Sequence, residues 1–142
     1  MMKITPRCQK ALTYAKESLS RLGHSHVSSA HLVLGLLAIS GVAVGLLRKA
    51  ALSVESVEGF LSSRRISAEA TTIRDGIPLG NSALQAFERG ETGARARQNT
   101  YLGTVDLLLG ILAEENGEAM DLFASVHFDR ERISRTIQEE IQ

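Results

Sequence analysis

Apolar residues recur three or four positions apart near the start of the chain, the spacing that places side chains on one face of a helix. The series comprises Cys8, Ala11, Leu12, Ala15, Leu19 and Leu22. Thr5 and Pro6 precede it, and both favour a helix start: a hydroxyl can cap an unpaired backbone N–H, and proline at the first helical position has no N–H to lose. Gly23 follows as a C-terminal stop. The pattern predicts a helix over about residues 6–22.

The same combination of spacing and capping residues predicts seven more helices. In the first half of the chain they span about residues 28–38, 42–51 and 53–63, with Ser28 or Ser29 and Ser53 as caps. In the second half they span about residues 82–96, 105–114, 118–125 and 130–141, with Thr104 and Asp129 as caps. The predicted fold class is therefore all-α, with about eight helices.

The predicted helix over residues 82–96 has the weakest signal of the eight. Gly90 and Gly93 lie inside it. Each glycine costs about 1 kcal/mol relative to alanine in a helix interior. We therefore expect this helix to be loose or broken.

Residues 64–79 show little periodicity. They contain Asp75-Gly76, which is a turn signal, and Ile77-Pro78, in which the proline disfavours helical geometry for the residue before it. We expect this segment to be a mobile linker.

A seven-residue motif occurs twice, 75 positions apart. Residues 32–38 read Leu-Val-Leu-Gly-Leu-Leu-Ala and residues 107–113 read Leu-Leu-Leu-Gly-Ile-Leu-Ala, identical at five of the seven positions. After the motif the offset becomes 76, because the second copy holds one extra residue. Two copies of one four-helix unit, each too small to bury its own apolar face, are expected to pack on each other. We expect one domain with repeat one at 1–63, the linker at 64–79 and repeat two at 80–142.

Glycine occupies the centre of both copies of the motif, at Gly35 and Gly110. Glycine is unfavourable inside a helix, so its presence in both copies indicates a close backbone approach that a Cβ would obstruct. We expect each of these glycines to mark a helix crossing. The alternative is that they persist from the duplication without a packing role.

Composition narrows the class of protein. The chain has 142 residues, 44% of them hydrophobic, with 16 Lys or Arg and 16 Asp or Glu. Because the charges balance, no overall electrostatic field favours binding to nucleic acid or to an anionic membrane. The longest apolar stretch, residues 32–47, is shorter than the roughly 20 residues of a membrane-spanning helix. One cysteine excludes an internal disulfide, and the start lacks the apolar core of a signal peptide. A cytoplasmic monomer is expected.

The sequence contains no assembled catalytic or metal-binding pattern, so we expect neither enzymatic activity nor a cofactor. It has no phosphate loop of the Gly-x4-Gly-Lys-Ser/Thr type. Cys8 falls on an apolar helix face, and the adjacent carboxylates Glu114-Glu115 point about 100° apart on a helix, which indicates a solvated surface. Two arginine groups, within 89–97 and 130–135, could bind phosphate or an acidic peptide. Neighbouring glutamates largely neutralise them and favour a role in solubility.

Several motifs carry a resemblance to a known family. They are Thr5-Pro6-Arg7-Cys8-Gln9-Lys10-Ala11-Leu12, Arg21-Leu22-Gly23-His24, the run from Ser28 to Leu36, and the run from Gly103 to Ile111 in the second copy. With them the chain resembles, over nearly its whole length, the amino-terminal repeat domain of the Clp family of AAA+ protein unfoldases, most closely the ClpC and ClpA type. The second copy has lost the Leu-Gly-His element and reads Arg97-Gln98-Asn99.

The resemblance implies a pseudo-twofold pair of four-helix repeats that recognises protein substrates or adaptor proteins and passes them to an ATP-driven unfoldase and its peptidase. The chain would be either a piece of a larger unfoldase or a free-standing relative. The alternative function is a free-standing peptide or small-molecule sensor that reuses the fold. Helix ends and the repeat junction are the surfaces on which a partner could dock. The candidate binding residues are Thr5, Ser29, His31, Arg95, Arg97, Thr104, Asp106, Arg130 and Arg132.

One departure from the family pattern bears on its ligand. The family motif commonly reads Gly-Thr-Glu-His. The resemblance to the ClpC type implies that this Glu binds the guanidinium of phosphoarginine marks on substrates. Ala30 and Val105 stand at the two Glu positions. An apolar side chain cannot pair with a guanidinium, so we do not expect this chain to grip phosphoarginine in that way.

Overall fold

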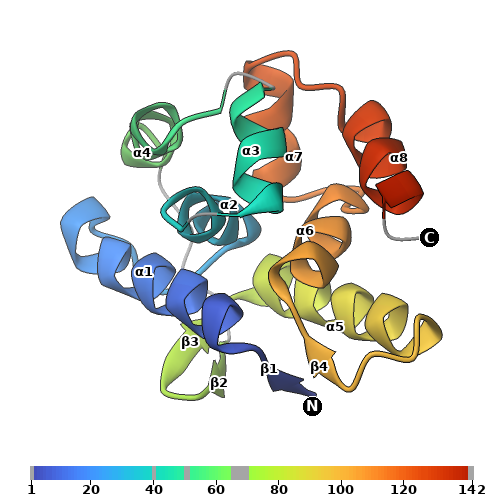
Figure 1. Cartoon of the computed structure of the whole chain (residues 1–142). Helices are drawn as coiled ribbons and strands as arrows, with labels where there is room; N and C mark the ends of the chain where they lie inside the picture. The colour runs from blue at the N-terminus through green and yellow to red at the C-terminus, as the bar shows by residue number, and fades with distance from the viewer. Residues whose placement is uncertain (1, 40, 50–51, 65–70, 141–142) are drawn as a thin grey trace.

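The computed structural model describes residues 2–39, 41–49, 52–64 and 71–140 (Figure 1). Eight α-helices lie within these described residues. They are α1 (Pro6–Leu22), α2 (Ser29–Leu37), α3 (Val42–Lys49), α4 (Val54–Ser62), α5 (Asn81–Ala96), α6 (Thr104–Leu112), α7 (Glu118–Ser125) and α8 (Arg130–Glu140). The all-α prediction is confirmed. Residues 50–51 and 141, which the sequence assigned to the ends of two helices, lie outside the described part of the chain.

The predicted start and stop signals act as expected in α1. The Thr5 hydroxyl accepts a hydrogen bond from the Cys8 N–H at 3.2 Å, and Pro6 is the first helical residue. At the other end, Gly23 adopts the left-handed conformation with φ of 72°, which glycine reaches without a Cβ penalty. These local contacts explain why the helix bounds could be predicted from the sequence alone.

Four short strands lie in the part of the chain that the structure describes. β1 (Lys3–Ile4) pairs in parallel with β4 (Tyr101–Leu102), and this pairing ties the start of repeat one to repeat two. β2 (Thr72–Arg74) and β3 (Ile77–Leu79) form an antiparallel hairpin. The sequence predicted neither pair, because two- and three-residue strands show no measurable alternation.

The hairpin lies in the segment that we expected to be a mobile linker. Its turn is the predicted Asp75-Gly76, with φ of 51° and 76°, the pair of positive values that favours Asp-Gly in a two-residue hairpin loop. Ile77 and Leu79 are 2% and 1% exposed and belong to the core. The strand β3 is therefore packed on the core and pairs with β2, and residues 65–70 lie outside the described residues.

Two further expectations about repeat two need correction. The helix α5 is continuous through Gly90, because this glycine packs against α6, where an added Cβ would lie 2.9 Å from the Asp106 carbonyl oxygen. Thr104 is not the cap of α6 but its first helical residue, and Gly103 occupies the N-cap. The Asp106 carboxylate accepts from the Gly103 N–H at 2.9 Å, so the capping group comes from within the helix.

The two repeats pack with pseudo-twofold symmetry around α2 and α6, which lie at the centre of the molecule (Figure 1). The helix α1 packs on α2, and α5 packs on α6 in the same way. Each central helix also contacts the last helix of its own repeat and the third helix of the other repeat: α2 contacts α4 and α7, and α6 contacts α8 and α3. No helix within the described residues is long and apolar enough to span a membrane.

Candidate functional site

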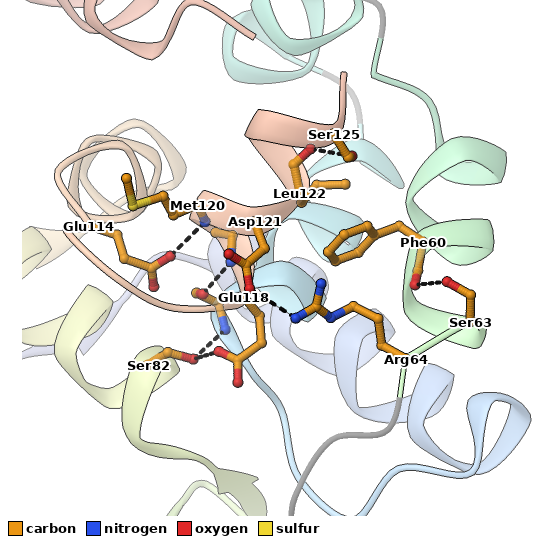
Figure 2. Close-up of polar contacts among 12 residues, drawn as sticks. Phe60, Ser63, Arg64, Ser82, Glu114, Glu118, Met120, Asp121, Leu122 and Ser125 are labelled. Carbon is orange, nitrogen blue, oxygen red and sulfur yellow. Dashed lines mark hydrogen bonds and ion pairs between the residues drawn. The ribbon is translucent and has the colours of Figure 1, made fainter. Parts of the chain in front are cut away.

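The N-termini of α2, α5 and α7 meet where the two repeats join (Figure 2). Ser29, the first residue of α2, is fully buried; its N–H donates to the Ser82 hydroxyl and its own hydroxyl accepts from the Ala119 N–H, both at 2.9 Å. The Ser82 hydroxyl donates to the Glu118 carboxylate at 2.6 Å. Ser29 therefore holds three helix ends together, a role that its position as a candidate binding residue did not indicate.

Glu114 lies beside this junction and is 1% exposed. Its carboxylate accepts from the Met120 N–H at 2.8 Å, as Figure 2 shows. Burial raises the pKa of the Glu114 carboxyl, against the opposing effect of hydrogen bonds from Ser29 and Met120. The sequence placed Glu114 on a solvated face, which is wrong, because α6 ends before it and its side chain is buried.

A side-chain cluster joins α4 to α7, which we call the filled junction: Phe60, Arg64 and Asp121. The Arg64 guanidinium pairs with the Asp121 carboxylate at 2.9 Å and lies 4.9 Å from the centre of the Phe60 ring. Figure 2 shows the ring pointing from α4 toward Leu122 of α7. The sequence did not single out these residues, because they are distant along the chain and carry no motif.

His24 and His31 form a hydrogen-bonded chain that links three parts of repeat one. The Ser28 N–H donates to His31 Nδ1 at 2.9 Å, so Nδ1 accepts and the proton of neutral His31 is on Nε2. That Nε2 lies 2.8 Å from His24 Nδ1, and His24 Nε2 lies 3.2 Å from the Arg64 carbonyl oxygen. Both ring nitrogens of the neutral His31 therefore have a matching partner. His31 is therefore a buried capping residue of α2.

The stability of the fold should depend on pH through His31. Burial first, then His24 and His26, lowers the pKa of His31 from 6.5 to about 3. The unfolded chain takes up a proton below its pKa of 6.5 and the folded chain does not, so the stabilisation is complete above that pH and is lost as the pH falls toward 3. We expect the free energy of unfolding to fall by about 2 kcal/mol from this residue between pH 7 and 5.

Urea unfolding at several pH values, with His31→Gln as the comparison, isolates this effect. Glutamine keeps a neutral side chain at the capping position, so the variant should lose the slope. Glu114 contributes with the opposite sign, since its raised pKa stabilises the fold at low pH, but that contribution cancels between the two proteins. Parallel pH profiles for both proteins would contradict the assignment.

Asp106 holds the position in repeat two that His31 holds in repeat one. Its carboxylate is ion-paired with the Arg97 guanidinium, and the Asn99 amide lies 3.5 Å from it. Arg95 pairs instead with the Glu91 carboxylate at 3.3 Å, and its side chain is 60% exposed. The structure thus brings together Asp106 and Arg97, which the sequence named separately.

The remaining candidate residues are spread over the molecule. Thr5 caps α1, and Thr104 begins α6. Arg130 donates to the Glu114 carbonyl oxygen, whereas Arg132 is exposed on α8. The nine candidates therefore do not form a single site, and their part in binding stays a prediction.

Arg132 borders a cavity of about 370 Å³ between α3 and α8, which we call the open groove. Its lining residues are Leu46, Lys49, His127, Phe128, Asp129, Arg132, Ile133 and Thr136. Leu46, Phe128 and Ile133 are half-buried against the core and form the apolar part. Lys49, His127 and Arg132 are exposed on its border. Only Arg132 among these residues was a candidate binding residue, whereas Asp129 was predicted as a helix cap.

The described residues hold no group of three or more His, Cys, Asp or Glu side chains that could bind a metal ion. Cys8 is fully buried in α1. Burial raises the pKa of its thiol to about 12, so the thiol stays protonated and is not a nucleophile at neutral pH. The open groove is a surface at which another molecule could bind.

The fold and its internal repeat define an all-α tandem-repeat domain. The Clp repeat (R) N-terminal domain family matches residues 3–126 and 79–142. The chain belongs to this family, as the resemblance in the sequence predicted.

Curated relatives and solved structures agree with this membership. The chain is 26% identical, over 99% of its length, to a probable ATP-dependent Clp protease ATP-binding subunit of Chlamydia pneumoniae, and 30% identical, over 82%, to the negative regulator of genetic competence ClpC/MecB of Bacillus subtilis. It spans only 17% and 14% of those two proteins.

The N-terminal domain of the chaperone ClpD from Arabidopsis thaliana has the same fold, with a TM-score of 0.81, 18% identity, and coverage of 98% of this chain and 94% of that one. The Hsp104 N-terminal domain from Candida albicans follows with a TM-score of 0.73, 16% identity, and coverage of 95% and 89%.

Proposed function

We propose that the chain is a non-enzymatic protein-binding module that recognises substrate or adaptor proteins for a Clp-type unfoldase and protease system. Membership of the Clp repeat N-terminal domain family is the observation that carries this proposal. Subunits of Clp unfoldases and peptidases are further partners of the same kind. We expect the chain to act in the cytoplasm as a monomer, without a cofactor, nucleic acid or membrane as partner.

The contacts of the site support a binding role over a catalytic one. Ser29, His31 and Asp106, the polar residues nearest the repeated motif, use their side chains to cap or join helices. Surface features remain for a partner, among them the open groove and its cationic border. A protein that binds through such a surface needs no assembled nucleophile or base.

Crosslinking in native cells, followed by affinity capture and quantitative mass spectrometry, tests the proposal. We expect Clp unfoldase or peptidase subunits, or proteins that such a system degrades, to be enriched over a control without the chain. A sensor would behave differently: no protein would be enriched, and the low-molecular-weight fraction of the same lysate would raise the melting temperature. That outcome would replace the proposal with the sensor function.

Phosphoarginine is expected to bind weakly. Ala30 is fully buried, Val105 is half-buried, and neither carries a carboxylate for the guanidinium. Loss of a charge-assisted hydrogen bond costs about 1.5–3 kcal/mol, so affinity should be at least about tenfold below that of a relative with Glu at these positions. Calorimetric titration of both proteins measures this. Val105→Glu is the restoring variant, because a carboxylate at the buried Ala30 would destabilise the fold. Equal affinity of the unmodified chain would contradict the expectation.

A further inference from the structure

The duplication creates two equivalent places in the fold. The helices α7 and α8 begin 76 residues after α3 and α4. The helices α4 and α7 both pack on α2, and α8 and α3 both pack on α6. The side where Arg64 after α4 pairs with Asp121 of α7 therefore corresponds to the side where α8 and α3 line the open groove. At this offset Phe60 corresponds to Thr136, Asp121 to Gly45 and Leu122 to Leu46. The filled junction and the open groove are pseudo-symmetric mates.

The chain fills the first of these places with its own side chains. Phe60 supplies an aromatic ring, and Arg64 lies over that ring while pairing with Asp121 (Figure 2). An aromatic group and a carboxylate beside a guanidinium are thus the groups that occupy this place in the fold.

The second place lacks the corresponding groups. Thr136 stands where the ring of Phe60 would be, and Gly45 stands where Asp121 would be. A Cβ added at Gly45 would meet nothing within 4 Å. Thr136 lines the open groove, whose apolar lining is Leu46, Phe128 and Ile133.

We propose that the open groove is a docking site for a segment of a partner protein in which an aromatic residue is flanked by acidic residues. The aromatic side chain would occupy the place that Phe60 fills in the mate. Lys49 and Arg132, both exposed on the border, would pair with the acidic residues. This inference rests on the proposed function and specifies the chemistry of the partner.

The charges around the groove favour an acidic segment over a basic one. Lys49 ends α3 and Arg132 lies in the first turn of α8, so two cationic side chains lie on its border. Asp129 is the acidic lining residue, and its carboxylate accepts the Arg132 N–H at 3.1 Å as the cap of α8. Its charge is therefore already engaged by the helix end, whereas Lys49 and Arg132 are exposed residues of the groove lining.

A labelled peptide tests the inference directly. The probe is a fluorescein-labelled peptide with phenylalanine between two pairs of aspartates, titrated with the purified chain and followed by fluorescence anisotropy. We expect saturable binding that weakens at least about tenfold when the phenylalanine is replaced by alanine, and by a similar factor when the aspartates are replaced by lysines.

Variants of the groove residues test whether the peptide binds in the open groove. Thr136→Phe introduces the residue that stands at the equivalent position of the filled junction. The new ring would fill the groove, so binding should weaken at least about tenfold without a lower melting temperature. Arg132→Glu should weaken it to a similar degree, and because Arg132 is exposed this variant keeps the test valid if Thr136→Phe folds poorly. Arg135→Glu, an exposed change on the same helix outside the groove lining, is the matched control and should leave the affinity unchanged.

The inference is overturned if the peptide fails to bind, if the alanine or lysine peptide binds equally well, or if folded Thr136→Phe and Arg132→Glu bind like the unmodified chain. It is also overturned if sedimentation shows a dimer that Thr136→Phe dissociates, because the occupant would then be a second copy. Crosslinked capture with Thr136→Phe separates the two proposals: partners that are still enriched leave the proposed function intact and remove the groove as their docking site.

Discussion

Replacing Gly35 or Gly110 with alanine should lower the free energy of unfolding by about 3 kcal/mol in each case. An added Cβ at Gly35 would lie closer than 3.0 Å to the carbonyl oxygen of Ala11, and one at Gly110 would lie equally close to that of Ala86. These neighbours are backbone atoms of α1 and α5, which cannot move without shifting a whole helix. Leucine should cost at least as much, at the upper end of the range for overpacked cores. Urea unfolding monitored by circular dichroism measures the effect.

Gly59 is the matched control for these variants. It also lies inside a helix, α4, but it is exposed and an added Cβ there would meet nothing within 4 Å. Alanine at this position should therefore raise the free energy of unfolding, by up to about 1 kcal/mol. If all three variants changed stability alike, helix propensity and not a close backbone approach would explain the glycines of the motif, and the helix crossings would lose their support.

Local chemistry explains what the sequence could predict. The bounds of α1 and α7 match the predicted ranges, and the caps Ser28, Ser53 and Asp129 act within three residues of their own positions. Such contacts involve neighbours along the chain, so residue type and spacing specify them. The repeat itself was visible as an offset of 75 positions that becomes 76 after the motif, and it correctly predicted the close contacts of Gly35 and Gly110.

Distant contacts explain what the sequence could not predict. Three features depend on neighbouring elements that are distant in the sequence. They are the burial of Glu114, the packing of β3 against the core and the continuity of α5. The open groove had a signal in the sequence, because the offset of 76 pairs Phe60 with Thr136. That signal can be interpreted only once the structure shows that Phe60 is part of the filled junction.

Replacing Glu91 with alanine should cost about 3–5 kcal/mol of stability. Glu91 of α5 pairs with Arg74 of β2 at 3.0 Å, and the two side chains are only 7% and 6% exposed. The Arg74 guanidinium also donates to the Met2 carbonyl oxygen and lies 4.8 Å from the centre of the Phe87 ring. Alanine would leave this guanidinium buried without its counter-charge, which is more costly than losing both partners together.

The pKa of Glu91 agrees with this dependence on its partners. Burial by itself raises the pKa, but the hydrogen bond from the Met2 N–H and the charge of Arg74 outweigh burial and leave the pKa lowered. A carboxyl with a lowered folded-state pKa stabilises the fold above its unfolded pKa and loses that contribution as the pH falls. Glu91→Ala should therefore be most damaging near neutral pH, and its difference from the unmodified chain should shrink in acid.

A double-mutant cycle separates the pair from its setting. Glu91→Leu and Arg74→Leu should each be strongly destabilising, whereas the double variant should recover much of the loss, because well-packed apolar residues often replace a buried ion pair at little cost. Glu88→Ala, an exposed change on the same helix, is the control and should stay within about 0.5 kcal/mol of the unmodified chain. If the two single losses simply add in the double variant, Arg74 and Glu91 are not coupled, and the hairpin is held to α5 by its apolar residues alone.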